Sequence, residues 1–255
     1  MENIIAARLG CYGSFRDRAW THMPQIGLKH IEVDVPGESQ ADELAKNLDQ
    51  SGLSASTMTL PVDIKQADVV ERVRPQLQML QRFGVRVGFA SVHAGEQDEE
   101  ATWQRLRAVG DCAAEHDVTI VMETHPNLMS NGEVAHRNLS NIDHPNVRMN
   151  FDTANVHYYN RGIDTVDELK KVIDYVGAVH LKESRGGFKT WDFPSLGKGI
   201  VDFPAVFELL NGRGFYGPFT MELEGTSDVD AEDESAVLDH IAESVAYLKR
   251  IGVMA

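Results

Sequence analysis

Residues 119–125 read Thr-Ile-Val-Met-Glu-Thr-His, an apolar run that ends in side chains able to bind a ligand. Successive side chains of a β-strand point to opposite faces. We therefore expect Val121, Glu123 and His125 on one face of a strand and Ile120 and Met122 on the other. Such a strand turns an apolar face towards covering helices and places polar groups on the opposite face.

Three later runs of the sequence show the same two-faced pattern. In each run, apolar side chains on one face oppose polar side chains on the other. The polar faces carry, in chain order, Asn150 and Asp152, then His180 and Lys182, then Thr220, Glu222 and Glu224. Polar groups that come late in parallel strands are typical of a barrel whose site lies at the C-terminal ends of its strands.

Short apolar runs alternate with amphipathic stretches along the whole chain. The predicted strands are 4–10, 30–35, 54–60, 85–92, 118–124, 147–152, 177–182 and 219–224. The predicted helices are 16–26, 39–50, 69–83, 99–116, 132–141, 166–176, 204–210 and 231–250. Glycines follow several helical stretches, where a left-handed cap ends a helix; these are Gly27, Gly52, Gly84 and the pair Gly212 and Gly214.

This alternation decides the fold class. Strands that alternate with helices indicate a parallel sheet covered by helices. Eight units favour a closed (β/α)8 TIM barrel with a metal site at its C-terminal mouth. An open doubly wound sheet is the alternative, but no Gly-x-Gly-x-x-Gly or Walker-type loop follows any predicted strand. Because such barrels run to about 250 residues, we expect residues 1–255 to form one domain.

Composition narrows the function classes. The sequence has 24 Lys and Arg against 39 Asp and Glu, a net charge of −15, which disfavours a nucleic-acid partner. Its two cysteines, Cys11 and Cys112, do not resemble a disulfide framework, although a single bridge between them stays open. No apolar run reaches the ~18–20 residues of a membrane span, and the start, Met1-Glu2-Asn3, lacks the pattern of a signal peptide. We therefore expect a cytoplasmic protein without a membrane partner, and a homo-oligomer stays open.

The late polar groups of four consecutive predicted strands suggest a metal site. Charges inside a barrel are costly unless they are paired or bound to a metal. The four deepest groups are Glu123, Asp152, His180 and Glu222. Three carboxylates and one imidazole suit a divalent cation such as Mn²⁺, Mg²⁺, Co²⁺ or Zn²⁺. Any one of them alone would fit an ordinary ion pair, whereas their recurrence favours the metal site.

Two of these carboxylates have the placement that proton transfer needs. Glu123 and Glu222 come from the fifth and eighth predicted strands and could flank a ligand from different sides. A base on one side removes a proton next to a carbonyl, and a second group returns it from the other side. A metal would hold the oxygen and stabilise the developing enolate charge.

Other late polar residues are candidates for substrate contact. They are Glu32, His93, His125 and Lys182. An ordinary ion pair or loop cap is an alternative role for each. The segment 183–201 is about one loop longer than the other connections, and we expect that it could cover the mouth as a lid.

Four short motifs carry a family resemblance. Val-Met-Glu-Thr-His-Pro around Glu123, Asn-Phe-Asp-Thr-Ala-Asn around Asp152, Val-His-Leu-Lys-Glu around His180 and Thr-Met-Glu-Leu-Glu around Glu222 resemble the xylose-isomerase-like TIM-barrel superfamily. Residues 196–207 look like the Gly-x-Gly-x-x-Asp segment before that superfamily's seventh helix. The superfamily includes sugar phosphate isomerases and epimerases and inosose dehydratases, with AP endonucleases as relatives.

The resemblance implies a role for each motif residue. Glu123, Asp152, His180 and Glu222 would bind one divalent metal ion, and Glu123 and Glu222 would also form the acid/base pair. Ketose 3-epimerases of this superfamily usually carry a histidine three residues after the strand-six aspartate, where it contacts substrate. Asn155 stands at that position here and becomes the expected substrate contact, which leaves the exact substrate open.

These observations predict a divalent-metal-dependent sugar isomerase or epimerase. It would act by proton abstraction and return through a metal-stabilised enediolate on a small sugar or cyclitol with a carbonyl group. The alternatives are an inosose-dehydratase-like lyase that uses the same metal site, a metal-dependent nuclease and a non-catalytic binding barrel. The nuclease is disfavoured because neither a basic surface nor a cluster of many histidine ligands is evident.

Overall fold

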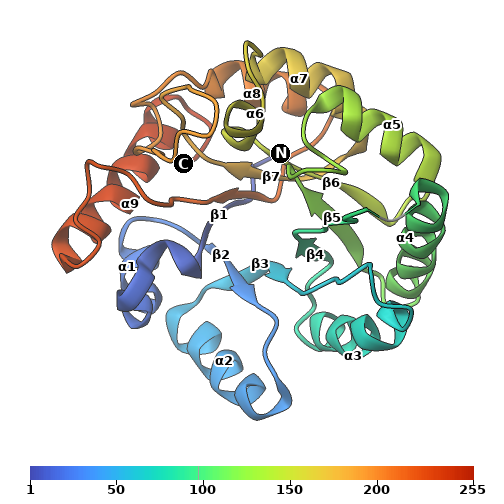
Figure 1. Ribbon diagram of the computed structural model, residues 1–255. Helices are drawn as coiled ribbons and strands as arrows, with labels where there is room; N and C mark the ends of the chain where they lie inside the picture. The colour runs from blue at the N-terminus through green and yellow to red at the C-terminus, as the bar shows by residue number, and fades with distance from the viewer. Residues whose placement is uncertain (97) are drawn as a thin grey trace.

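Eight parallel strands close into a barrel in the order of the chain (Figure 1). The computed structural model describes residues 1–96 and 98–255. The strands are β1 (Ile5–Arg8), β2 (His30–Asp34), β3 (Ser54–Thr59), β4 (Val87–Ala90), β5 (Thr119–Glu123), β6 (Val147–Asp152), β7 (Val176–Leu181) and β8 (Phe219–Met221). Pairing of β8 with β1 closes the barrel. The predicted fold class is confirmed.

Helices surround the barrel on the outside (Figure 1). They are α1 (Ala19–Gln25), α2 (Glu38–Ser51), α3 (Val69–Arg82), α4 (Glu99–Ala114), α5 (Gly132–Ile142), α7 (Thr165–Val172), α8 (Phe203–Gly212) and α9 (Glu234–Arg250). Every predicted helix has a counterpart among them. The 3₁₀ segment η2 (Ile173–Tyr175) lies within the predicted helix 166–176, whereas α6 (Asn155–Tyr159) and most of the 3₁₀ segment η1 (Leu9–Arg18) were not predicted.

Local sequence signals explain where most helices begin. Aspartate or asparagine side chains accept backbone N–H groups at the starts of five helices; these caps are Asp98, Asn131, Asp164, Asp202 and Asp233. Such caps satisfy N–H groups that have no partner within the helix. After α8, Gly214 takes the left-handed conformation, with φ of +79°, whereas Gly212 lies inside the helix. The predicted cap therefore belongs to Gly214.

The alternation of side chains along the strands is confirmed. Ile120 and Met122 of β5 face outward into the main apolar core between strands and helices. Val121 instead packs with Phe89 and Ala178 in a small separate cluster inside the barrel. Since Glu123 follows Val121 by two residues, the alternation places its side chain on the inward face, one layer nearer the mouth. His180 follows Ala178 in the same way.

The outer core offers a direct test of the packing. Phe207 of α8 is 1% exposed, and its ring lies 4.5 Å from the ring of Phe219 in β8. We expect Phe207→Ala to lower the free energy of unfolding by about 3–5 kcal/mol, because it leaves a cavity in a close-packed region. Urea unfolding measures this loss. Phe188→Ala, on a half-buried loop side chain, is the control and should cost less than about 1 kcal/mol. Equal losses in both variants would contradict the described packing.

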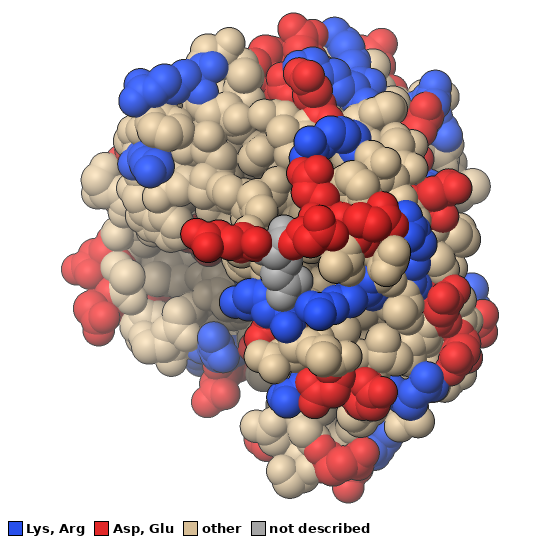
Figure 2. All heavy atoms as spheres, turned by 45° about the vertical axis from the view of Figure 1, so that its right-hand side comes forward, with Lys and Arg blue, Asp and Glu red and all other residues tan. Residues whose placement is uncertain are grey.

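Two sequence-based expectations concern the chain as a whole. Cys11 and Cys112 are both free thiols. Within residues 1–96 and 98–255, none of the helices combines the length and the apolar character that crossing a membrane requires. The face in Figure 2 carries acidic and basic side chains side by side around a hollow.

Candidate metal centre

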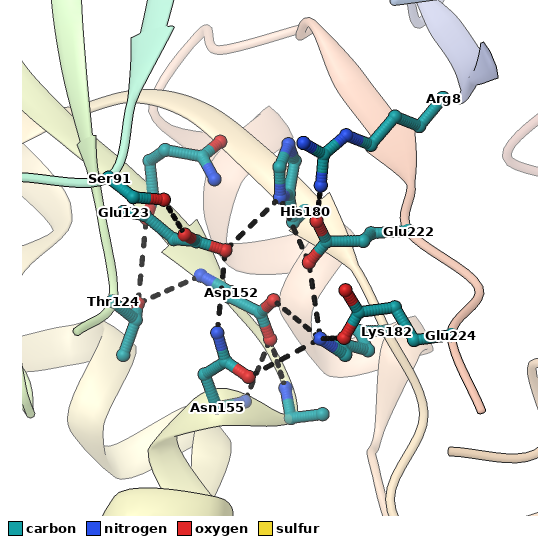
Figure 3. Close-up of polar contacts among 12 residues, drawn as sticks. Arg8, Ser91, Glu123, Thr124, Asp152, Asn155, His180, Lys182, Glu222 and Glu224 are labelled. Atoms are coloured by element: carbon teal, nitrogen blue, oxygen red, sulfur yellow. Dashed lines mark hydrogen bonds and ion pairs between the residues drawn. The ribbon is translucent and has the colours of Figure 1, made fainter. Parts of the chain in front are cut away.

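Four side chains from neighbouring strands converge at the mouth of the barrel (Figure 3). Glu123 ends β5, Asp152 ends β6, His180 lies in β7, and Glu222 directly follows β8. One potential ligand atom from each lies within 4.8 Å of those of the other three. All four residues are buried, and each has at most 4% of its surface exposed. The structure therefore brings together the four residues that the sequence singles out.

Unpartnered polar atoms show that this cluster fits a divalent cation. Nδ1 of His180 lies 3.8 Å from Oε1 of Glu123 and 3.4 Å from Oε2 of Glu222. This nitrogen and Oδ2 of Asp152 are buried without a hydrogen-bond partner. Burying such atoms unpaired costs free energy. Carboxylates and imidazole are ordinary ligands of divalent metals, so a cation among them would satisfy both atoms.

A carboxylate on the far side of the barrel fixes the ring of His180. Nε2 of His180 lies 3.3 Å from Oε2 of Glu32, and both side chains are 1% exposed. Metal-binding histidines commonly donate their second ring N–H to such a carboxylate. The sequence suggested Glu32 as a substrate contact. The structure places its carboxylate against His180, because its strand faces β7 across the barrel interior; the substrate contact stays a prediction.

One buried cation, Lys182, and one half-buried cation, Arg8, offset part of the negative charge. Nζ of Lys182 lies 3.2 Å from Oε2 of Glu222 and also pairs with Glu224. Arg8 pairs with Glu222 and lies 3.5 Å from Glu32. The carboxylates still outnumber these two cations, which leaves room for further positive charge.

The environment shifts the pKa values of the cluster in different directions. Burial raises the pKa of Asp152, although Lys182 acts against this shift. For Glu123, burial and the Glu222 charge act to raise the pKa, but the neighbouring imidazoles of His125 and His180 hold it below its usual range. For Glu222, burial is likewise outweighed by His180 and Lys182, so its pKa is also lowered. Glu123 and Glu222 are therefore held as carboxylates, the form that can accept a proton.

The two oxygens of Glu123 have different neighbours. Oε1 faces His180 and accepts a hydrogen bond of 3.4 Å from Nδ2 of Asn155. Oε2 accepts a hydrogen bond from Oγ of Ser91 and lies 2.7 Å from Nδ1 of His125. One oxygen of Glu123 is thus turned towards the four-residue cluster and the other away from it.

A cavity of about 170 Å³ adjoins the cluster. It is lined by Arg8, Ser91, Glu123, His125, Asn155, Tyr159, Lys182, Trp191, Glu222 and Glu224. Three of the predicted substrate contacts, His125, Asn155 and Lys182, therefore face this space. His93 is placed differently: its Nδ1 lies 2.9 Å from the carbonyl oxygen of Pro126, and its side chain is exposed.

Three residues that line this cavity were not predicted from the sequence. Two of them, Arg8 at the end of β1 and Ser91 directly after β4, are polar residues late in a strand. The reasoning that identified Glu123 by its late position in a strand applies to both. Tyr159 lies on α6, a helix of five residues. Such a helix is too short to show a hydrophobic period.

The long segment 183–201 forms a wall of this cavity. The ring of Phe193 lies 4.4 Å from Nζ of Lys182, and Trp191 lies 5.6 Å from it. The buried carboxylate of Glu183 accepts backbone N–H groups at both ends of the segment: from Ser184 at 2.9 Å, Gly197 at 2.9 Å and Val201 at 3.0 Å. Trp191 brings this segment to the edge of the cavity, and the bonds to Glu183 hold the segment in place; a covering role stays a prediction.

Comparisons with known proteins agree with this architecture. Residues 21–251 match the family model described as xylose isomerase-like TIM barrel. L-ribulose-5-phosphate 3-epimerase of Salmonella typhi is 29% identical over 170 residues, which cover 63% of this chain and 58% of that protein. The corresponding Escherichia coli enzyme is 29% identical over 183 residues, 68% of this chain and 61% of that protein. The chain thus spans about three-fifths of the length of these curated relatives.

Two solved structures share the fold at low sequence identity. D-allulose 3-epimerase from Methylomonas sp., in complex with D-allulose, superposes with a TM-score of 0.74 at 18% identity, covering 98% of both chains. A xylose isomerase-like TIM barrel protein from Mycobacterium smegmatis, in complex with magnesium, has a TM-score of 0.76 at 18% identity, covering 99% of this chain and 98% of the other.

Proposed function

The chain belongs to the xylose isomerase-like TIM barrel family, and on this premise we propose that it is a divalent-metal-dependent sugar isomerase or epimerase. Residues 1–255 would act as one barrel unit on a small polyhydroxy carbonyl substrate. The observation that carries the proposal is the convergence of Glu123, Asp152, His180 and Glu222 beside a cavity. Relatives named as sugar 3-epimerases support the same class of reaction.

The four converging residues would hold the metal ion. When bound, a cation such as Mn²⁺, Mg²⁺, Co²⁺ or Zn²⁺ would polarise a substrate oxygen and stabilise negative charge on it. The relative that is crystallised with magnesium supports a divalent ion in this family.

Two carboxylates would move the proton. Glu123 and Glu222 lie on opposite sides of the cluster, with His180 between them (Figure 3). Glu123 would take the proton from the carbon next to the carbonyl, which breaks the C–H bond. Glu222 rests as a carboxylate, so it would first take up a proton from solvent and then give it to the opposite face of the same carbon, while Glu123 would release the abstracted proton to solvent; the reverse reaction would exchange the roles. Positioned acid/base groups of this kind contribute about 10²–10⁴-fold to a rate.

The remaining polar groups of the cavity would bind the substrate. Lys182, Asn155 and His125 present ammonium, amide and imidazole groups to this space. Such groups can hydrogen-bond the hydroxyl and carbonyl oxygens of a sugar. This assignment explains why a lysine that is 2% exposed faces a cavity.

Proton exchange with the solvent tests the function. We expect incubation with a panel of ketoses, inososes and other keto-sugars in D₂O, with Mn²⁺ present, to place deuterium on the carbon next to the carbonyl of at least one sugar. NMR would follow the exchange and the appearance of the epimer or isomer. Loss of water from the product, seen by mass spectrometry, would indicate a lyase instead. Absence of exchange across the whole panel would contradict the proposal.

The contact between Glu32 and His180 gives a test of the metal site that does not depend on turnover. We expect Glu32→Gln to weaken Mn²⁺ binding by about 10–100-fold, the usual effect of removing the partner of a metal-bound histidine. Titration calorimetry measures this affinity directly. Glu38→Gln, on the exposed start of α2, is the matched control and should bind Mn²⁺ like the unmodified protein. An unchanged affinity in Glu32→Gln would show that His180 does not depend on this contact.

A further inference from the structure

Trp191 presents a large apolar ring at the edge of the cavity beside the metal cluster. It is 57% exposed, and it is the one aromatic residue among the large apolar side chains that the structure describes as exposed. The other three, Met1, Ile4 and Ile200, do not line this cavity, whereas Trp191 does. Single exposed apolar side chains are common on protein surfaces, so the surroundings of this ring decide whether its place has a function.

The backbone next to Trp191 is held by contacts on its C-terminal side. The carboxylate of Asp192 accepts a hydrogen bond of 2.7 Å from Oγ1 of Thr226. The N–H of Phe193 donates a hydrogen bond of 3.2 Å to the carbonyl oxygen of Gly225. The segment after β8 therefore fixes Trp191 at the edge of the cavity without burying its side chain.

The indole ring itself is also held in one orientation. The rings of Tyr158 and Phe193 stand nearly perpendicular to it, at 85° and 79°, with centroids 5.8 and 5.0 Å away. Edge-to-face pairs of this kind are favourable. The pyrrole edge of the indole lies against Gly225, where an added Cβ would be 2.8 Å from Nε1 and 3.3 Å from Cδ1. A ligand that binds to this ring would not have to order it first, which favours binding.

We propose that the indole of Trp191 is a stacking platform for the carbon skeleton of the bound sugar or cyclitol. The inference rests on the proposed function, because it assigns the side chain that holds the part of the substrate that does not react. The face of an aromatic ring carries partial negative charge, and the C–H groups of a polyhydroxy compound carry partial positive charge. One side of the substrate would lie on the indole, and its hydroxyl groups would stay free for hydrogen bonds.

The position of Lys182 supports this assignment. Its Nζ lies over the indole, 5.6 Å from the ring centroid, within the range in which an ammonium group is attracted to a ring face. Both side chains line the same cavity. A ring face of Trp191 is therefore directed towards the polar groups of the cavity, and a sugar lying on it would have the ammonium group nearby for its oxygens.

Two variants disturb the platform by different routes. Trp191→Ala removes the ring, whereas Gly225→Ala keeps the ring and adds a Cβ from which the indole must move away. Trp191→Phe keeps a smaller aromatic face and is the conservative variant. Trp20→Phe, on α1 and outside the cavity lining, is the matched control. Since Trp191 is largely exposed, we expect thermal unfolding and Mn²⁺ affinity to stay unchanged in all four variants.

Binding is measured by calorimetry on the Mn²⁺-loaded protein with unreactive polyols, a panel of pentitols, hexitols and inositols. For at least one of them, we expect the dissociation constant to rise about three- to tenfold in Trp191→Ala and in Gly225→Ala, the effect of one lost aromatic contact. In Trp191→Phe and Trp20→Phe it should stay within about twofold of the unmodified protein. KM for the reacting sugar should follow the same order, with kcat changed less.

Tryptophan emission reports the contact directly. The sequence has three tryptophans, and Trp191 is the most exposed of them. We expect a saturating polyol to protect emission from quenching by acrylamide in the unmodified protein and in Trp20→Phe. The protection should vanish in Trp191→Phe, although that variant still binds the polyol. A ring with a structural role alone would show no protection in any of these proteins.

The outcomes separate this inference from the proposed function. Unchanged polyol affinity in Trp191→Ala, or absence of protection in the unmodified protein, would overturn the platform even with turnover intact. A lower unfolding temperature, together with equal losses of affinity in Trp191→Ala and Trp191→Phe, would show that the ring only anchors the segment 183–201 and would also overturn it. If no sugar exchanges its proton but a polyol protects Trp191 and binds more weakly to Trp191→Ala, the platform is supported and the proposed reaction is not.

Discussion

Replacing Glu123 by glutamine is expected to lower kcat by about 10²–10⁴-fold when the metal ion is saturating. An amide cannot accept a proton at neutral pH, so the step that breaks the C–H bond loses its base. The remaining side-chain oxygen can still face the cluster, as Oε1 of Glu123 does beside His180 and Asn155. Deuterium exchange into the substrate should fall in parallel with kcat, because both report the same proton.

The experiment needs a control for lost metal and for lost fold. Turnover is measured over a range of Mn²⁺ concentrations, so that weaker metal binding appears as a shift in the Mn²⁺ requirement rather than as a lower plateau. Glu133→Gln, in the exposed first turn of α5, is the matched control and should leave kcat unchanged. If Glu123→Gln kept more than about a tenth of kcat at saturating Mn²⁺, another residue would have to be the base.

Replacing Asp152 by asparagine is expected to abolish metal binding while leaving the metal-free fold intact. Oδ1 of Asp152 accepts the backbone N–H groups of Ala154 and Asn155 at 2.8 and 2.7 Å, and the amide oxygen of asparagine can do the same. Oδ2 faces the cluster without a hydrogen-bond partner, and Nζ of Lys182 lies 3.9 Å from it. In the variant an NH₂ group takes its place, and such a group cannot bind a cation.

Thermal and urea unfolding, with and without Mn²⁺, reveal this change. In the unmodified protein, Mn²⁺ at 100 times its dissociation constant should stabilise the fold by about 2.7 kcal/mol, and a chelator should remove this gain together with the activity. Asp152→Asn should show no gain. Mn²⁺-dependent stabilisation of equal size in Asp152→Asn would show that this carboxylate is not a ligand.

Without metal, the same variant should be at least as stable as the unmodified protein at neutral pH. The pKa of Asp152 is raised by burial, so the folded state disfavours the ionised form relative to the unfolded chain. The stability that the protonated group contributes is present at low pH and is lost as the pH rises through the raised pKa. Asparagine stays neutral at every pH and avoids this loss. The variant's advantage should therefore shrink on acidification.

Much of the fold was predictable because strands and helices follow from short stretches of sequence. The eight apolar runs correspond to the eight strands, and the capping residues mark the helix starts. Strand ends were less predictable, since they depend on pairing partners. Glu222 belongs to a predicted strand, yet β8 ends at Met221, where its pairing with Ala7 of β1 and Leu181 of β7 also ends.

The candidate site was predictable in its members but not in its contacts. Alternation and position in the strand placed Glu123, Asp152, His180 and Glu222 on the inward face near the mouth. The same rule could not tell that Glu32 meets His180, because that contact joins residues 148 positions apart across the barrel interior. Local sequence predicts on which face of its strand a side chain lies and how near the mouth it lies. Its contact partners across the barrel are set only when the sheet closes.

The carboxylate of Glu183 has a consequence for the thermodynamics of ligand binding. Its hydrogen bonds to both ends of the segment 183–201 form when the chain folds. Fixing a backbone costs roughly 1–2 kcal/mol of entropy per residue, and here that loss belongs to folding rather than to ligand capture. The segment is therefore preorganised before a ligand binds, and the free energy of binding does not include the entropy cost of ordering the segment.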